Sequence, residues 1–121
     1  MVYVLVGALG GLGSIFRFYL NDKITHSFFP VSTLLVNVVG SFLIGYLFYL
    51  LSEERFVLSE QAHIALMAGV LGGLTTFSGF SLDTIKLFQG GYILYGFLNI
   101  LSNVGLCLLF CYIGVKVSES F

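Results

Sequence analysis

The chain has 121 residues, of which 58% are hydrophobic and 9% are charged, and its formal net charge at pH 7 is -1. Soluble domains average about 45–50% apolar and about 25% charged residues, so this composition excludes a soluble globular domain and indicates an integral membrane protein. The near-zero net charge provides no basic face, and we therefore expect no nucleic acid partner.

Four apolar segments are long enough to cross a bilayer core of about 30 Å, which needs about 20 helical residues. We expect them at residues 2–20, 31–51, 61–88 and 92–117, joined by connections at 21–30, 52–60 and 89–91. A β-barrel is not expected, because the apolar runs are continuous rather than alternating. Residues 1–121 should form a single all-α domain of four transmembrane helices, multi-pass in the cell (plasma or inner) membrane and surrounded by the lipid bilayer.

The third span contains the most informative stretch, residues 69–80, which reads GVLGGLTTFSGF. Glycine and β-branched residues weaken a helix, and an unwound backbone inside a bilayer has to line a cavity or be buried in protein. We therefore expect this span to be broken within the stretch and to form a site on the route of an ion. Carbonyl groups released at Gly72, Gly73 and Thr75 are strong acceptors of the kind that coordinates Na+ in membrane proteins.

Small residues recur at four-residue spacing in three of the spans. Such spacing lets two helix backbones approach closely in lipid, and helix packing is the favoured interpretation. The pairs are Gly7 with Gly11, Ser41 with Gly45, and Gly69 with Gly73.

The basic residues divide almost evenly between the two sides of the membrane. Arg55 and Lys116 belong to the side of the termini and the second connection, whereas Arg17, Lys23 and Lys86 belong to the other. Orientation in membranes follows the Lys/Arg asymmetry of short loops, so a chain without this asymmetry can insert either way up. Two oppositely oriented copies would then form an antiparallel dimer and supply the inverted repeat on which transporter sites are built.

The spans contain no Asp, Glu, Lys or His at mid-depth, and neutral hydrogen-bonding side chains take their place. An amide or hydroxyl group can donate to a dehydrated anion, and a neutral donor can release it again, as conduction requires. For any single residue, hydrogen bonding between helices is an equally good explanation. The residues concerned are Thr33, Asn37, Thr75, Thr76, Ser78, Asn99 and Asn103.

Phe77 and Phe80 lie within the same stretch and share one helical face, because they are three residues apart. Such a pair is most often packing in a core or against lipid. However, the edge of an aromatic ring carries partial positive charge. Ring edges turned inward could contact an anion in a narrow dry passage, and the position of the rings beside the predicted break favours that interpretation.

Three motifs point to a family: GGLGSIFR at residues 10–17, TLLVNVVGSFLIG at 33–45 and GGLTTFSGF at 72–80. With them, the chain resembles the Fluc/CrcB fluoride channels over essentially its whole length. The resemblance implies a small four-helix protein that assembles as an antiparallel dual-topology dimer. It also implies passive export of fluoride for fluoride resistance, through two pores per dimer, with a structural Na+ at the dimer centre.

The resemblance also implies roles for individual residues. Phe77 and Phe80 look like the pore phenylalanines, and Asn37 looks like the pore asparagine. The remaining implied roles are the polar residue one turn away (Thr33), the carbonyl ligands of Na+ (Gly72 and Thr75) and the first-span arginine (Arg17).

The chain departs from the family pattern at three positions. Gly79 stands where the family usually has Thr, and Asn99 and Asn103 stand where a Tyr and a Ser commonly form a polar track. Asparagine still donates hydrogen bonds, so conduction is expected, with altered rate and anion discrimination. Some bacteria carry paired homologues, so the partner is either a second copy in a homodimer or a homologue in a heterodimer.

Two other functions fit parts of the sequence. A small multidrug-resistance-type exporter would share the size, the number of spans and the dual topology, but it needs a buried carboxylate, which the spans lack at mid-depth. A non-transporting helix-bundle subunit would explain the glycines but not the concentration of Asn, Thr and Ser. An enzyme is not expected, because no nucleophile–base pair or metal cluster is present.

Overall fold

The computed structural model describes residues 1–24, 27–53, 55 and 57–121. Residues 25, 26, 54 and 56, which belong to the first two predicted connections, lie outside the described residues. The described residues form helices and no strand, and four of the helical segments are long and apolar enough to span a membrane. The prediction of an all-α chain with four spans is therefore confirmed.

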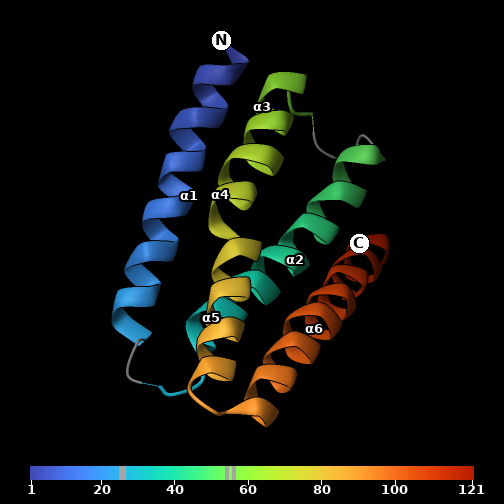
Figure 1. The fold of residues 1–121 in the computed structure, drawn as a ribbon. Helices are drawn as coiled ribbons and strands as arrows, with labels where there is room; N and C mark the ends of the chain where they lie inside the picture. Colours follow the sequence, from blue (N-terminus) through green and yellow to red (C-terminus); the bar gives the residue numbers. More distant parts are fainter. Residues whose placement is uncertain (25–26, 54, 56) are drawn as a thin grey trace.

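The first, second and fourth spans are single helices, and the third is made of several pieces (Figure 1). The first span is longer than expected, because its helix continues through Ile24. The helices are α1 (Val2–Ile24), α2 (Val31–Ser52), α3 (Glu60–Ile64), the π-helical η1 (Ala65–Leu71), α4 (Gly72–Leu74), α5 (Phe77–Gln89) and α6 (Ile93–Glu119).

Local sequence signals explain several helix ends. Pro30 immediately precedes α2, and Ser59 caps α3 by accepting a hydrogen bond from the Ala62 amide at 3.2 Å. The tight connection between α5 and α6 requires Gly91, whose φ of 84° is disfavoured for other residues. Because this connection is so short, α5 and α6 lie against each other.

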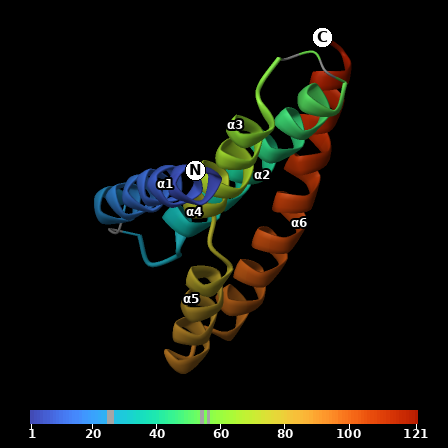
Figure 2. The same ribbon diagram turned by 90° about the horizontal axis from the view of Figure 1, so that it is seen from above.

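The helices pack as two groups that the third span connects. α1 lies against η1 and α4, α2 lies against α6, and α5 turns away from α1 to pack on α6 (Figures 1 and 2). The third span therefore changes partners at its break: the part before it belongs with α1 and the part after it with α6. Many large apolar side chains remain on the outside, as expected of helices that face lipid.

Glycines make the contact between α1 and the third span possible. A methyl group added at Gly13 would collide with the Val70 carbonyl, and one added at Gly73 would collide with the Gly10 carbonyl. Gly69 similarly faces the backbone of Val6. The predicted packing role of Gly69 and Gly73 is confirmed.

The same prediction is wrong for Gly7 and Gly11 within the chain, because both face open space. The backbone of α1 meets the third span at Val6, Gly10 and Gly13, which share a different face of α1. Between α2 and α6, Gly45 packs on the main-chain carbonyl of Cys111, as the four-residue spacing of Ser41 and Gly45 predicted. Gly114 packs on the main-chain carbonyl of Phe42. The spacing of small residues thus predicted the contacts at Gly45 and at Gly69 and Gly73. For α1 it indicated a helix face that makes no contact within the chain.

Candidate functional site

The third span is interrupted at Thr75 and Thr76, which are both extended between α4 and α5. The last helical hydrogen bond before the interruption joins the Thr75 amide to the Leu71 carbonyl at 3.1 Å. The break is therefore confirmed, but it is shorter and later than the glycines suggested. Gly73 stays helical and packs against the backbone of α1 at Gly10, whereas Gly72 is helical although it is exposed.

Asn37 on α2 supplies the hydrogen bonds that the broken helix lacks. Its Oδ1 accepts from the Thr76 amide at 2.8 Å, and its Nδ2 donates to the Thr76 carbonyl at 3.1 Å. Backbone groups inside a membrane have to be satisfied by protein, and one buried amide side chain satisfies both groups of Thr76. The Thr76 hydroxyl in turn caps α5 by accepting from the Gly79 amide at 2.9 Å.

Asn37, Asn103 and Asn99 form a continuous chain of amide hydrogen bonds, which we call the asparagine ladder. Asn37 Nδ2 donates to Asn103 Oδ1 at 3.1 Å, and Asn103 Nδ2 donates to Asn99 Oδ1 at 2.9 Å. Asn99 Nδ2 donates to the Thr84 hydroxyl at 2.9 Å, which donates to the Phe80 carbonyl at 2.8 Å. The ladder therefore joins α2, α6 and α5.

The ladder is buried, with exposed fractions of 8%, 4% and 0% for Asn37, Asn103 and Asn99. Both amide hydrogens of Asn37 are used by protein acceptors, and the same holds for Asn103, whose Nδ2 also reaches the Asn99 carbonyl at 3.0 Å. Their donors are thus committed within the chain.

A first cavity, of about 430 Å³, lies beside the break and receives both phenylalanines. Phe80 is 7% exposed and Phe77 is 76% exposed, and their rings meet edge to face with centroids 5.2 Å apart. The side chains that line the cavity with an amide or hydroxyl group are Asn37, Ser41, Thr75, Thr76 and Asn103.

A second cavity, of about 550 Å³, lies on the other side of the break. Thr76 lines both cavities, so the interrupted backbone lies between them. Within the second cavity, the Thr33 hydroxyl donates to Asp83 Oδ2 at 2.8 Å, and the hydroxyls of Thr76 and Ser78 share a hydrogen bond of 3.2 Å. Lys86 lines the same cavity.

Arg17 also lines the second cavity, and it is half-buried rather than directed to the membrane surface. Its Nη1 donates to the Thr75 carbonyl at 3.4 Å. Because α1 continues through Ile24, Arg17 lies well inside this helix rather than at its end. Its position on the face of Gly10 and Gly13 turns it toward the break.

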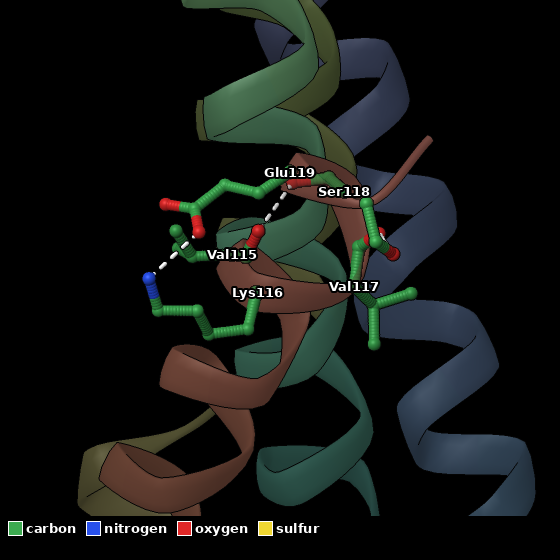
Figure 3. A network of polar contacts seen from close by, with 6 residues as sticks. Val115, Lys116, Val117, Ser118 and Glu119 are labelled. Atoms are coloured by element: carbon green, nitrogen blue, oxygen red, sulfur yellow. Dashed lines mark hydrogen bonds and ion pairs between the residues drawn. The ribbon is translucent and has the colours of Figure 1, made fainter.

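The ionic pair on α6 lies far along that helix from the ladder. Lys116 Nζ is 2.7 Å from Glu119 Oε2, and the adjacent Ser118 hydroxyl donates to the Val115 carbonyl at 2.8 Å (Figure 3). Arg55 reaches the Ser118 carbonyl at 3.4 Å. The charged side chains of this helix are therefore gathered at its carboxyl end, and its surface around the ladder is neutral.

The structure thus divides the predicted site residues between two cavities and one buried position. Asn37, Asn103, Phe77 and Phe80 line the first cavity, Thr33, Ser78 and Arg17 line the second, and Thr76 lines both. Gly72 and Thr75 also line the first cavity. Asn99 lines neither of these cavities and is fully buried behind Asn103.

Three further residues belong to the site and were missed from the sequence: Ser41, Asp83 and Thr84. Each lies one helical turn from a residue that was identified, since Ser41 follows Asn37 by four, and Asp83 and Thr84 follow Phe80 by three and four. Residues at these spacings share a helical face. That spacing was the available signal.

These features define a multi-pass membrane protein with four spans, a broken third span, and a cavity on each side of the break. The sequence profile described as "CrcB-like protein, Camphor Resistance (CrcB)" matches residues 4–115. The chain therefore belongs to the CrcB-like family, and the resemblance recognised in its motifs is confirmed.

Three relatives illustrate the similarity, and each is named "Fluoride-specific ion channel FluC". The protein of Ruminiclostridium cellulolyticum is 38% identical over 120 residues, which cover 97% of this chain and 92% of that protein. The protein of Campylobacter fetus subsp. fetus is 43% identical over 113 residues, covering 90% and 87%. The protein of Nitratiruptor sp. is 46% identical over 106 residues, covering 85% and 80%.

Proposed function

We propose that this chain is a fluoride channel of the cell membrane, not an enzyme, and that it lets fluoride leave the cell passively. The observation that carries the proposal is the pair of cavities on either side of Thr76 in a chain whose relatives are named fluoride-specific ion channels. A membrane potential drives an anion outward by about 2.3 kcal/mol per charge per 100 mV. Export for fluoride resistance therefore needs no coupled energy source.

The proposed pathway runs through both cavities. Fluoride would enter the second cavity beside Arg17, Thr33 and Ser78, pass Thr76, and continue along the ring edges of Phe77 and Phe80. The positive charges of Arg17 and Lys86 favour an anion at the entry, and the partly positive ring edges favour it in the dry part. Asn37 and Asn103 shape the wall of the first cavity, and Asn99 acts through the ladder that orients them.

The residues of the second cavity bear on the alternative function, a small multidrug-resistance-type exporter of cations. Its carboxylate would be Asp83, which is half-buried and, at 1.5 Å per residue, about 9 Å from the end of α5. However, Asp83 accepts a hydrogen bond from Thr33 and shares its cavity with Arg17 and Lys86. These two cations outnumber the one carboxylate and disfavour a cationic substrate, so the arrangement supports the anion channel.

The proposed assembly is an antiparallel dual-topology dimer, either of two copies or of this chain with a paired homologue. Phe77 is largely exposed, and Gly72 beside the same cavity is exposed as well. Polar, non-helical backbone at this depth has to be covered by protein rather than lipid. A second, inverted chain would cover the open side of the first cavity, which accords with the even division of basic residues.

A structural Na+ at the centre of that dimer is a further part of the proposal. Among the described residues, no cluster of His, Cys, Asp or Glu could hold a metal, so main-chain oxygens would do so. The carbonyls of Gly72 and Thr75 fit this role, because the amide that would close the helix on Gly72 donates to Asn37 instead. Arg17 already contacts the Thr75 carbonyl and would compete with the cation there.

Fluoride efflux from liposomes that contain only this chain tests the proposal. We expect rapid, fluoride-selective efflux that needs no proton gradient, measured with a fluoride electrode. Drug uptake driven by a proton gradient, without fluoride flux, would favour the exporter. The absence of flux in liposomes with correctly assembled protein would refute a self-sufficient homodimeric channel.

A further inference from the structure

We propose that the hydroxyl group of Ser41 is a direct hydrogen-bond donor to fluoride in the first cavity. The inference rests on the proposed function and adds to it a contact residue on α2. Fluoride is small and strongly hydrated, so a dry passage has to offer close donors in place of water. The question is which donor in the cavity is free to turn to the anion.

The amide donors of the cavity are already committed. Asn37 Nδ2 donates to the Thr76 carbonyl and to Asn103 Oδ1, and Asn103 Nδ2 donates to two oxygens of Asn99. A primary amide has only two hydrogens. Neither asparagine can contact fluoride through this group without breaking a buried hydrogen bond.

The threonine hydroxyls of the cavity are also occupied. The Thr75 hydroxyl donates to the Leu71 carbonyl at 3.1 Å. The Thr76 hydroxyl oxygen accepts a hydrogen bond from the Gly79 amide and shares a second one with the Ser78 hydroxyl. Ser78 lines the second cavity rather than the first.

Ser41 is different, because its hydroxyl has no hydrogen-bond partner in the part of the chain that the structure describes. Hydroxyls in helices commonly return their hydrogen to the carbonyl four residues earlier, as Ser81 and Thr84 do here to Phe77 and Phe80, both at 2.8 Å. Ser41 makes no such bond to Asn37. Its oxygen is not sealed in the core, and the residue lines the cavity that receives both phenylalanines.

The position of Ser41 adds to this argument. It lies one helical turn from Asn37 on the same face of α2, so it faces the cavity just beyond the backbone that Asn37 holds. Its O–H can rotate without disturbing the ladder. The geometry thus separates two tasks: the asparagines fix the wall, and Ser41 supplies the mobile donor.

The test compares fluoride efflux from liposomes that contain the parent chain, Ser41→Ala, Ser41→Cys or Ser41→Thr. A hydrogen bond to a charged group accounts for a roughly 10- to 100-fold effect. We expect a loss of that size in Ser41→Ala and in Ser41→Cys, which keeps the volume but loses the strong donor. Ser41→Thr should retain flux within a few-fold. The matched control is Ser102→Ala, which removes a hydroxyl from α6 at a position that lines neither cavity.

The half-saturating fluoride concentration and the fluoride-to-chloride selectivity should change in Ser41→Ala and not in Ser102→Ala, which a purely structural role would not produce. Assembly is checked by size-exclusion chromatography for every variant. Parent-like flux and selectivity in Ser41→Ala would overturn this inference and leave the proposed function intact. Absence of flux in the correctly assembled parent would instead refute the self-sufficient homodimeric channel on which this inference rests.

Discussion

The asparagine ladder leads to a prediction about the free energy of unfolding that does not follow from the number of hydrogen bonds a variant loses. Asn103→Leu keeps the side-chain volume, so no cavity is created, but it leaves an Nδ2 hydrogen of Asn37 and the Oδ1 of Asn99 without their partners. A buried unsatisfied group costs about 1–3 kcal/mol, so two of them cost about 2–6 kcal/mol. Hydrogen bonds between membrane helices average about 0.6 kcal/mol, which places the expected loss at the low end, about 2 kcal/mol.

The double variant Asn99→Leu/Asn103→Leu makes this reasoning sharper. In this variant the Oδ1 of Asn99, which Asn103→Leu alone leaves without a donor, is removed as well. The main unpaired group that remains is one Nδ2 hydrogen of Asn37. Thr84 loses only a donor to its hydroxyl and keeps its bond to Phe80. We therefore expect the double variant to be no less stable than Asn103→Leu alone, although it has lost more contacts.

The measurement is reversible unfolding in mixed micelles with increasing SDS, followed by circular dichroism at a fixed protein concentration, since a dimer's stability depends on concentration. The two single variants and the double variant complete a double-mutant cycle. If the two single losses simply add in the double variant, the ladder is not an energetic unit and the reasoning is refuted.

Three other substitutions test the rest of the site and fold. Phe80→Ile should abolish or severely reduce fluoride flux while leaving the proposed dimer intact on size-exclusion chromatography, and parent-like flux would make Phe80 a packing residue. Asn37→Ala should slow fluoride efflux from liposomes, because it frees the interrupted backbone, and unchanged turnover would contradict this role. Gly13→Ala should destabilise the fold by about 1–3 kcal/mol in SDS unfolding, because its methyl group meets the Val70 carbonyl, whereas Gly11→Ala should be nearly neutral; equal effects would contradict the assigned helix face.

The spans and the presence of a break could be predicted from the sequence, because both depend on local properties. Continuous hydrophobicity identifies spans directly, and the motif around Phe77 marks the interruption. The exact position of the break could not be read in the same way. Gly72 and Gly73 have low helix propensity, yet both are helical, Gly73 because it packs on Gly10 of α1, and the chain unwinds where Asn37 offers replacement hydrogen bonds.

The sequence identified polar residues that lie around the break, but not their hydrogen-bond partners. Asn37, Asn99 and Asn103 were expected to offer donors to an anion, and the structure instead shows their amides bonded to one another or to Thr76 and Thr84. Which polar side chain meets which across helices depends on the rotation of α2 against α6, and one sequence does not encode that rotation in any local pattern. For the same reason, α1 presents Gly10 and Gly13 rather than Gly7 and Gly11.

The interruption at Thr75 and Thr76 also sets how deep α5 sits. Extended backbone advances about 3.3 Å per residue, whereas a helix rises 1.5 Å, so the two residues push α5 along the span axis by about 3–4 Å relative to an unbroken helix. They also change the direction around the helix axis in which the first side chains of α5 point. The number of threonines in the interruption, as much as their chemistry, therefore acts as a spacer that fixes the depth and heading of the phenylalanine pair.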